Sequence, residues 1–341
     1  MTNRKVTLPD RNASIDIMRL LASIAVVAIH TYPFKSYGST IDMVRYAFCT
    51  WAVPFFFTVT GYYFDINNEN RALVKLWLMM RLYFIWTLIY FPIIFVRKIY
   101  KQENIMHAIL EEIKDILFVG SYFQLWYFVA MIWSLLLLLL IIRFKRGENL
   151  VFVIATLFYF LNCMISNYNL QLEESVKKIW LFWGNGLNFL CMGLPFIFVG
   201  MKARSKLFDV KNRKIFFMVS VALWVMESFF LILFRGKLSQ PMLSLPILML
   251  GLVKVLSDQK WPVPDWECKL FRDVSTIIFL IHTFFITVWN TILEATEENS
   301  NGELFGSTLW FFILVLLSSF LGALVIIYMA KKIKILRKLY E

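Results

Sequence analysis

Residues 14–32, SIDIMRLLASIAVVAIHTY, form the apolar stretch that decides the fold, because they are long enough to cross a bilayer yet carry ionisable side chains. Arg19 and His30 share one face of the predicted helix and lie about 16 Å apart along its axis. Asp16 lies one turn before Arg19 and is placed to neutralise it. Ionisable groups in a membrane helix usually face the protein interior and mark function. The alternative is that Arg19 anchors the helix among lipid headgroups and His30 lies at the opposite interface.

The composition is typical of a protein that crosses a membrane several times. Of the 341 residues, 60% are hydrophobic and only 17% are charged. Apolar runs of about 17 to 25 residues predict membrane-spanning helices. We therefore predict an all-α fold, a polytopic bundle of about ten transmembrane helices. The spans are expected at about residues 14–32, 42–64, 75–96, 122–142, 149–167, 180–200, 214–234, 240–256, 273–294 and 307–330. Residues 104–119, between the third and fourth spans, predict an amphipathic helix on the membrane surface.

The distribution of positive charge argues against nucleic-acid binding, although the net charge is +12. With the N-terminus inside, the predicted cytoplasmic segments contain 23 Lys and Arg residues and the outside loops contain 9. The other three of the 35, Arg19, Arg45 and Arg81, lie within spans. This is the positive-inside pattern of membrane proteins. It predicts that both termini are cytoplasmic.

The cysteines and prolines bear on the interior of the bundle. The four cysteines show no metal-ligand spacing, so we predict packing roles, no disulfide and no metal site. Prolines lie within predicted spans at Pro54, Pro92, Pro195 and Pro246. Prolines inside a helix free backbone carbonyls, which only protein or a water-filled cavity can satisfy in a membrane. We therefore expect an internal polar cavity.

Two more polar residues lie deep within predicted spans. Glu227 is the only acidic residue so placed, and it must be paired, protonated or in contact with water. Its partner could be Arg81, Arg19 or a histidine, and a purely structural ion pair stays open. His282 lies near the middle of the ninth span, where it either serves the function or hydrogen-bonds a neighbouring helix.

Arg71, Lys75 and Arg81 lie near the cytoplasmic mouth in this topology. Such cations suit a phosphate-bearing ligand, and they equally suit anionic lipid heads. A cavity with histidine, carboxylate and cations is compatible with acyl transfer, in which histidine takes a proton from a hydroxyl and a cation holds the donor. It is also compatible with binding of a zwitterionic small molecule. The residues by themselves leave both functions open.

These motifs resemble those of the membrane acyltransferase-3 family. Arg19 and His30 match its Arg-x10-His signature, and VPFFFTVTGYYF (53–64) is similar to its Pro-x-Phe-Phe pattern, with Thr60 in place of the usual Ser. LWLMMRLYFIW (76–86) resembles the basic motif of the third helix. QLWYFVA (124–130) resembles the Leu-Trp-Phe motif, although Gln124 stands where His is common. GLPFIFVGM (193–201) and STIIFLIHTFF (275–285) resemble the later motifs.

The resemblance implies transfer of an acyl group, often acetyl, from cytoplasmic acyl-CoA to a hydroxyl of a cell-envelope glycan. It implies catalytic roles for His30, Arg19 and Glu227. It implies that the substrate-binding residues are Arg81, His282, Trp126, Asn185 and Thr60. The departures at Thr60 and Gln124 leave open whether transferase chemistry is retained.

A closer resemblance is to the membrane domain of the serine racemases of vancomycin-resistance clusters. It is carried by residues 53–64 and 125–130, the Glu-Ser pair 227–228 and the Gly-Asn-Gly of WGNGLNF (183–189). Those proteins join this membrane domain to a cytoplasmic racemase domain that uses pyridoxal phosphate. The resemblance implies that residues 1–341 are one membrane domain that binds or imports L-serine for D-serine formation in peptidoglycan synthesis, and that the racemase domain would follow residue 341.

The expected partners are the lipid bilayer and a small-molecule substrate, either L-serine or acyl-CoA with a hydroxyl acceptor. No cofactor is expected in this chain, since pyridoxal phosphate would belong to the racemase domain. A cytoplasmic racemase domain or partner and a homodimer are further expectations. The resemblance places the protein in a bacterial plasma membrane. A third hypothesis is a non-catalytic scaffold that anchors a cytoplasmic partner.

Overall fold

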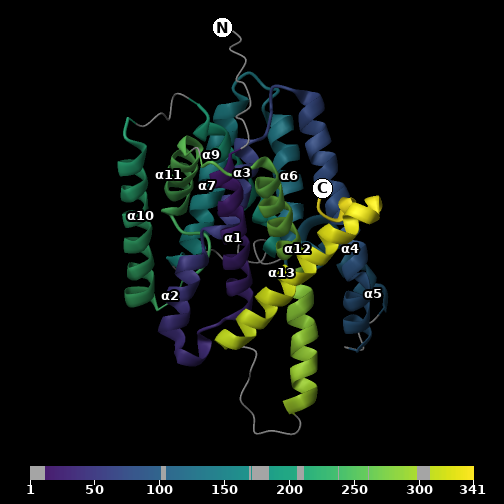
Figure 1. Cartoon of the computed structure of the whole chain (residues 1–341). Coiled ribbons are helices and arrows are strands. Elements are labelled where there is room, and N and C mark those ends of the chain that lie inside the picture. Colours follow the sequence, from purple (N-terminus) through teal and green to yellow (C-terminus); the bar gives the residue numbers. More distant parts are fainter. Residues whose placement is uncertain are drawn as a thin grey trace.

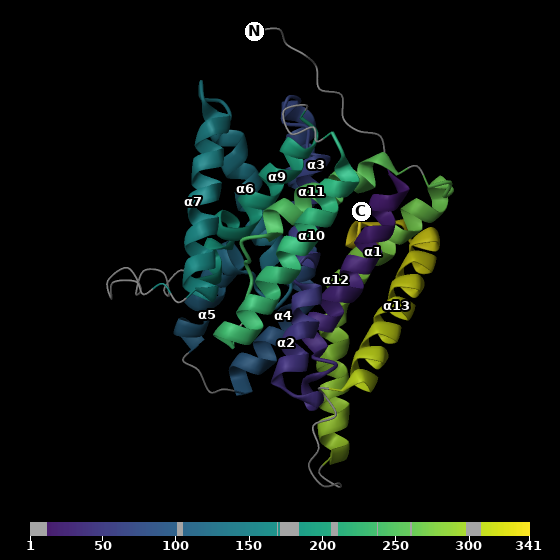
Figure 2. The same ribbon diagram turned by 90° about the vertical axis from the view of Figure 1, so that its left-hand side faces the viewer.

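The computed structural model of the protein describes residues 12–100, 105–168, 170, 184–205, 211–236, 238–259, 261–297 and 308–341. Throughout these residues there is no strand, which confirms the all-α prediction. Figure 1 shows long helices running roughly side by side, with α1 (Ala13–Thr31) in the middle of the bundle. In Figure 2, α6 (Trp126–Ile141) and α7 (Gly147–Asn167) lie on one side and α13 (Leu309–Lys332) lies on the other.

The remaining α-helices are α2 (Ser39–Cys49), α3 (Ala52–Tyr62), α4 (Glu69–Tyr100), α5 (Ile105–Lys114), α9 (Leu194–Ala203), α10 (Arg213–Phe230), α11 (Leu245–Asp258) and α12 (Asp265–Glu297). Short 3-10 and π-helical segments are η1 (Lys35–Tyr37), η2 (Asp115–Val119), η3 (Gly184–Leu187), η4 (Phe189–Gly193), η6 (Leu231–Arg235) and η8 (Lys334–Leu339).

Six helices in the described part of the chain are long and apolar enough to cross a membrane. They are α1, α7, α13 and the segments Glu69–Val96, Arg213–Arg235 and Asp265–Leu293. These six coincide with predicted spans. Two shorter apolar helices, Trp126–Ile141 and Phe189–Ala203, coincide with two more. The total of ten spans stays a prediction, and residues 180–183 and 307 of the predicted spans lie outside the described residues.

The start of α1 is fixed to the end of α11 by hydrogen bonds. The Asn12 side chain caps α1 by accepting from Ser14 N at 2.9 Å, and its Nδ2 donates to the backbone oxygens of Leu256, Ser257 and Gln259. The α1 face that packs inward consists of small and branched apolar side chains that are fully or almost fully buried: Ile15, Ala22, Val26 and Val27. Close packing of this face lets α1 run beside α12, α3 and α13. Arg19 and His30 are therefore carried on the central helix.

The predicted span 42–64 is not one continuous helix, because α2 ends at Cys49 and α3 starts at Ala52. The Thr50 hydroxyl donates to Ala47 O at 2.8 Å, and the Thr50 backbone oxygen accepts from the Gln240 side-chain amide. Pro54 lies in the first turn of α3, where a missing N–H is tolerated. The backbone oxygens of Ala47 and Thr50 at the break between α2 and α3 therefore both accept hydrogen bonds, one from the same turn and one from a distant loop.

Two of the four prolines mark helix starts, and none of the four lines the cavity. Pro54 and Pro246 lie in the first turns of α3 and α11, whereas Pro92 lies in the interior of α4 and Pro195 directly follows the π-helical turn η4 inside the apolar helix Phe189–Ala203. Proline in a first turn frees no carbonyl, so the proline argument for a cavity does not hold at Pro54 and Pro246. A polar cavity is nevertheless present, and its lining contains no proline. The four cysteines are free and buried.

Candidate functional site

A cavity of about 530 Å³ lies between α1, α3, α4, α6, α12 and the segment that follows α13. It is lined by charged side chains on one part of its wall and by aromatic side chains on another. The charged side chains are Asp16, Arg19, Lys75, Lys269, Arg272, Asp273 and Glu341. Since Asp16 and Arg19 lie in the first two turns of α1, the cavity opens toward the N-terminal half of that helix.

Asp16 and Arg19 form the ion pair that the sequence predicts. Arg19 Nη1 lies 3.0 Å from Asp16 Oδ1, and Arg272 Nη1 on α12 lies 3.9 Å from the other carboxylate oxygen. The Arg19 guanidinium also lies 5.8 Å from the centre of the Tyr63 ring. Ser275 Oγ donates to Arg19 O at 2.9 Å and fixes α12 against α1. Arg19 is therefore held in place by Asp16 of its own helix, by Tyr63 at the end of α3 and by Ser275 of α12.

The other lining cations differ in their partners. Lys269 Nζ lies 2.9 Å from a carboxylate oxygen of Glu341, and Arg272 Nε lies 3.8 Å from Asp273. Lys75 makes no ion pair or hydrogen bond with any residue that the structure describes. Lys75 is thus the one lining cation whose charge no described carboxylate offsets.

Aromatic side chains separate this cavity from the two histidines. Phe279 lines the cavity, and its ring centre lies 5.8 Å from Phe56, 5.2 Å from Tyr127 and 6.2 Å from His282. We call Phe56, Tyr127 and Phe279 the aromatic floor. Because Phe279 lies beside Phe56 and Tyr127 and also beside His282, it connects the charged cavity with the histidine side of the bundle.

His30 and His282 lie side by side, with ring centres 5.3 Å apart. His282 is fully buried, and its Nδ1 lies 3.1 Å from Ile278 O, an atom that can only accept. Nδ1 therefore carries the hydrogen, which leaves a lone pair on Nε2 of the neutral ring. Nε2 is buried and has no hydrogen-bond partner in the described part of the chain. Such an unpartnered atom is able to accept a proton from a hydroxyl or from the neighbouring ring.

A polar network that the sequence did not reveal positions the His282 segment. Gln124 Nε2 donates to Leu280 O at 2.8 Å, and the Thr283 hydroxyl donates to Gln124 Oε1 at 2.7 Å. The Tyr90 hydroxyl also donates to Leu280 O, at 2.6 Å. Gln124 stands where the family often has His, and here both ends of its amide tie the start of α6 to α12. A single buried glutamine gives no periodic signal, so only the departure from the motif could have pointed to it.

Besides His282, two predicted substrate-binding residues, Arg81 and Trp126, lie away from the cavity lining. The Arg81 guanidinium lies 5.0 Å from the Trp77 ring on the same helix, and the Trp126 ring lies 6.3 Å from Phe57. Thr60, by contrast, lines the cavity. Asn185 belongs to the turn Gly184–Leu187, and its side chain lies outside the part that the structure describes.

Glu227 also lies apart from the cavity, with its contacts at the end of α7 and at the start of α11. Its Oε1 accepts from Tyr168 Oη at 2.9 Å and from Leu243 N at 2.8 Å, and its Oε2 accepts from Ser244 N at 2.7 Å. A carboxylate at this position satisfies N–H groups at a helix start and interacts favourably with the helix dipole. None of the three possible partners predicted for Glu227 is among these contacts.

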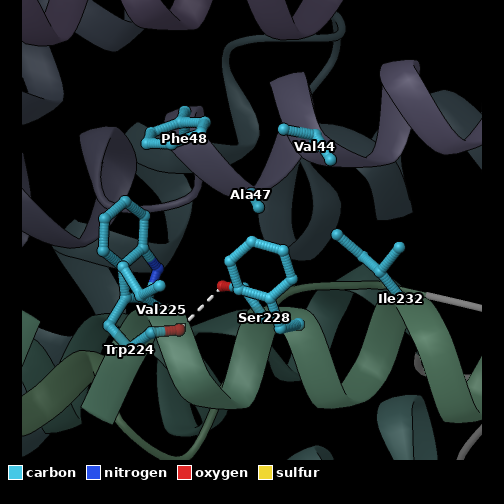
Figure 3. A pocket seen from close by; sticks show the side chains of 8 residues that line it. Val44, Ala47, Phe48, Trp224, Val225, Ser228 and Ile232 are labelled. Carbon is cyan, nitrogen blue, oxygen red and sulfur yellow. Dashed lines mark hydrogen bonds between the residues drawn. The ribbon is translucent and has the colours of Figure 1, made fainter. Parts of the chain in front are cut away.

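A smaller hollow between α2 and α10 is unsuited to chemistry. Figure 3 shows that Val44, Ala47 and Phe48 face Val225 and Ile232 across it, and its volume is about 30 Å³. Its one hydroxyl, on Ser228, donates to Trp224 O at 2.8 Å, so it is occupied within its own helix. The charged cavity and the histidine pair are therefore the candidate site.

The fold and site define a multi-pass membrane protein with a charged internal cavity. The acyltransferase-3 family model, described as an acyltransferase domain, matches residues 12–328, and the chain belongs to this family. The chain is 27% identical to an amino-acid racemase of Enterococcus faecalis over 348 residues, which cover 95% of this chain and 47% of that protein. It is 26% identical to a serine/alanine racemase of Enterococcus gallinarum over 81% of this chain and 41% of that protein. The chain thus spans about half the length of the curated relatives it matches. No solved structure matches it.

Proposed function

We propose that this chain is the membrane module of a serine racemase system and that it binds L-serine and carries it across the plasma membrane of a bacterium. A cytoplasmic racemase domain or partner would then convert the L-serine to D-serine for cell-wall precursors that confer vancomycin resistance. The main support is the alignment with an amino-acid racemase, which covers 95% of this chain at 27% identity. In this proposal both termini are cytoplasmic, and the pyridoxal phosphate chemistry lies outside residues 1–341.

The charges of the cavity support a zwitterionic ligand. A small amino acid brings one carboxylate and one ammonium group, and the cavity lining offers groups of both signs. Lys75 has no described partner to compete with a ligand carboxylate, and Asp273 lies 3.8 Å from its nearest cation, which is beyond hydrogen-bonding distance. Thr60 also lines the cavity, where its side chain interacts with that of Tyr127. Charged groups at membrane depth require such pairing.

Uptake by vesicles tests the proposal. Proteoliposomes that contain the purified chain should take up labelled L-serine saturably and faster than D-serine, and protein-free vesicles should not. L-serine should also raise the thermal unfolding midpoint of the chain in detergent, because a ligand that binds the folded state stabilises it. Absence of both saturable uptake and stabilisation would show the proposal to be wrong.

A second candidate function is O-acyl transfer from cytoplasmic acyl-CoA to a hydroxyl of a cell-envelope glycan. The observation that favours it is the buried, unpartnered Nε2 of His282 beside His30. In this reaction the acceptor oxygen would attack the thioester carbonyl, the thiolate of CoA would leave, and a histidine would pass the hydroxyl proton to that thiolate. The test is release of free CoA from acetyl-CoA in the presence of a glycan acceptor. His30→Ala should abolish release while retaining acetyl-CoA binding, and no affinity for CoA esters at millimolar concentration would exclude the reaction.

A further inference from the structure

A second cavity adjoins the charged cavity at its α3–α4 side. Its volume is about 360 Å³, and it extends along the loop from the end of α3 to the start of α4, where Asp65 and Arg71 line it. Three residues line both cavities: Tyr63, Lys75 and Leu78. Lys75 therefore lies at the junction of the two cavities.

Helix geometry explains why Lys75 lines the two cavities and Arg81 does not. Leu78, Met79 and Leu82 follow Lys75 at spacings of three, four and seven residues, and all three line the charged cavity. These spacings define one stripe of a helix, whereas Arg81 projects about 120° away from Lys75. This angle agrees with the contact between Arg81 and the exposed Trp77.

The charge of Lys75 is available in a way that the other lining charges are not. Arg19, Lys269 and Arg272 each have a carboxylate within 4 Å, but Lys75 is half-buried and has no such partner among the described residues. An ammonium group removed from water costs free energy unless an anion or water compensates it. The junction of the two cavities is therefore a favourable place for a negatively charged group of a ligand.

We infer that Lys75 holds the anionic group of the transported or reacting ligand at the junction of the two cavities. The inference rests on the proposed function for the identity of that group, which is then the carboxylate of L-serine. A phosphate of CoA offers the same chemistry if the second candidate function holds. Arg81, which the sequence suggested for donor binding, would have no contact with that group.

Ligand titration of the full chain in detergent, followed by thermal unfolding, tests the inference. The ligands are L-serine, CoA and serinol, which keeps the ammonium and hydroxyl groups of serine but has no carboxylate. Lys75→Met should weaken L-serine binding about 10- to 100-fold, the range for loss of one hydrogen bond to a charged group. Lys75→Arg should bind L-serine nearly as the wild type does. Serinol should bind weakly, and equally so to wild type and Lys75→Met.

Lys145→Met is the matched control, because Lys145 is exposed in the loop between α6 and α7 and lines neither cavity. It should bind every ligand as the wild type does. The unfolding midpoint without ligand shows whether each variant folds. If Lys75→Met does not fold, Lys75→Arg still tests the requirement for a positive charge at this position.

The outcomes separate this inference from the proposed function. If Lys75→Met binds L-serine normally, the inference is wrong while the proposed function stands. If wild type binds CoA but not L-serine, and Lys75→Met loses CoA, the proposed function is wrong and Lys75 holds a phosphate. If neither L-serine nor CoA binds wild type, both are wrong. If Lys75→Arg loses binding as fully as Lys75→Met, a positive charge at this position is not sufficient and the inference is overturned.

Discussion

Glu227→Ala is expected to destabilise the bundle strongly and to leave the ligand affinity of the folded protein unchanged. The carboxylate of Glu227 accepts from Leu243 N at 2.8 Å and from Ser244 N at 2.7 Å, at the start of α11. Alanine leaves both N–H groups without this acceptor, and a buried donor without a partner costs about 1–3 kcal/mol. The expected loss of stability is therefore about 2–6 kcal/mol for the two donors together.

A series of variants tests the magnitude. Tyr168→Phe removes only the hydroxyl that donates to Glu227 at 2.9 Å, so it should cost about 1 kcal/mol. Glu227→Gln keeps one acceptor oxygen and turns an amide NH₂ toward a backbone donor, so its cost should lie between the other two. The assay is the thermal unfolding midpoint in detergent, with and without L-serine. An unchanged midpoint combined with lost ligand binding in Glu227→Ala would refute the structural role and restore the catalytic one.

Three further predictions concern other contacts. Gln124→Leu should lower stability by about 1–3 kcal/mol, because the Thr283 hydroxyl loses its acceptor, and the unfolding midpoint measures it. Trp86→Phe removes the donor to Leu339 O at 2.8 Å, so trypsin should cleave the basic C-terminal turn faster while the bundle stays intact; an equal cleavage rate would contradict this. Phe279→Ala should open the aromatic floor, so labelled L-serine uptake into proteoliposomes should become faster and less stereoselective, and unchanged uptake would show that the floor does not limit passage.

Local features of α1 were predictable from sequence because they depend on helix spacing. The i,i+3 spacing of Asp16 and Arg19 predicts their ion pair, and the structure confirms it at 3.0 Å. The contact between His30 and His282 joins residues 252 positions apart in the chain. No periodicity within one helix can reveal it, and only the family motifs suggested both residues.

Glu227 shows a different limit of sequence reasoning. The sequence places an acidic residue deep in a span, where its charge requires compensation, and it predicts a charged side chain as the partner. The compensation comes instead from a tyrosine hydroxyl and two backbone N–H groups. Every residue except proline has a backbone N–H group, so the residue type does not show which N–H groups donate to a carboxylate. The sequence therefore does not reveal that a helix start lies beside Glu227.

The position of the aromatic floor makes different demands on the two candidate functions. The charged cavity and the histidine pair lie on either side of Phe279, and Arg19 and His30 are about 16 Å apart along α1. If an amino acid held at Lys75 leaves the charged cavity on the histidine side, it must pass Phe279, so transport along this route requires Phe279 to move. Acyl transfer requires only that the thioester end of a long donor reaches His30 while its phosphates stay with the cations. A floor that opens for a small zwitterion therefore favours transport, and a floor that admits only an extended chain favours acyl transfer.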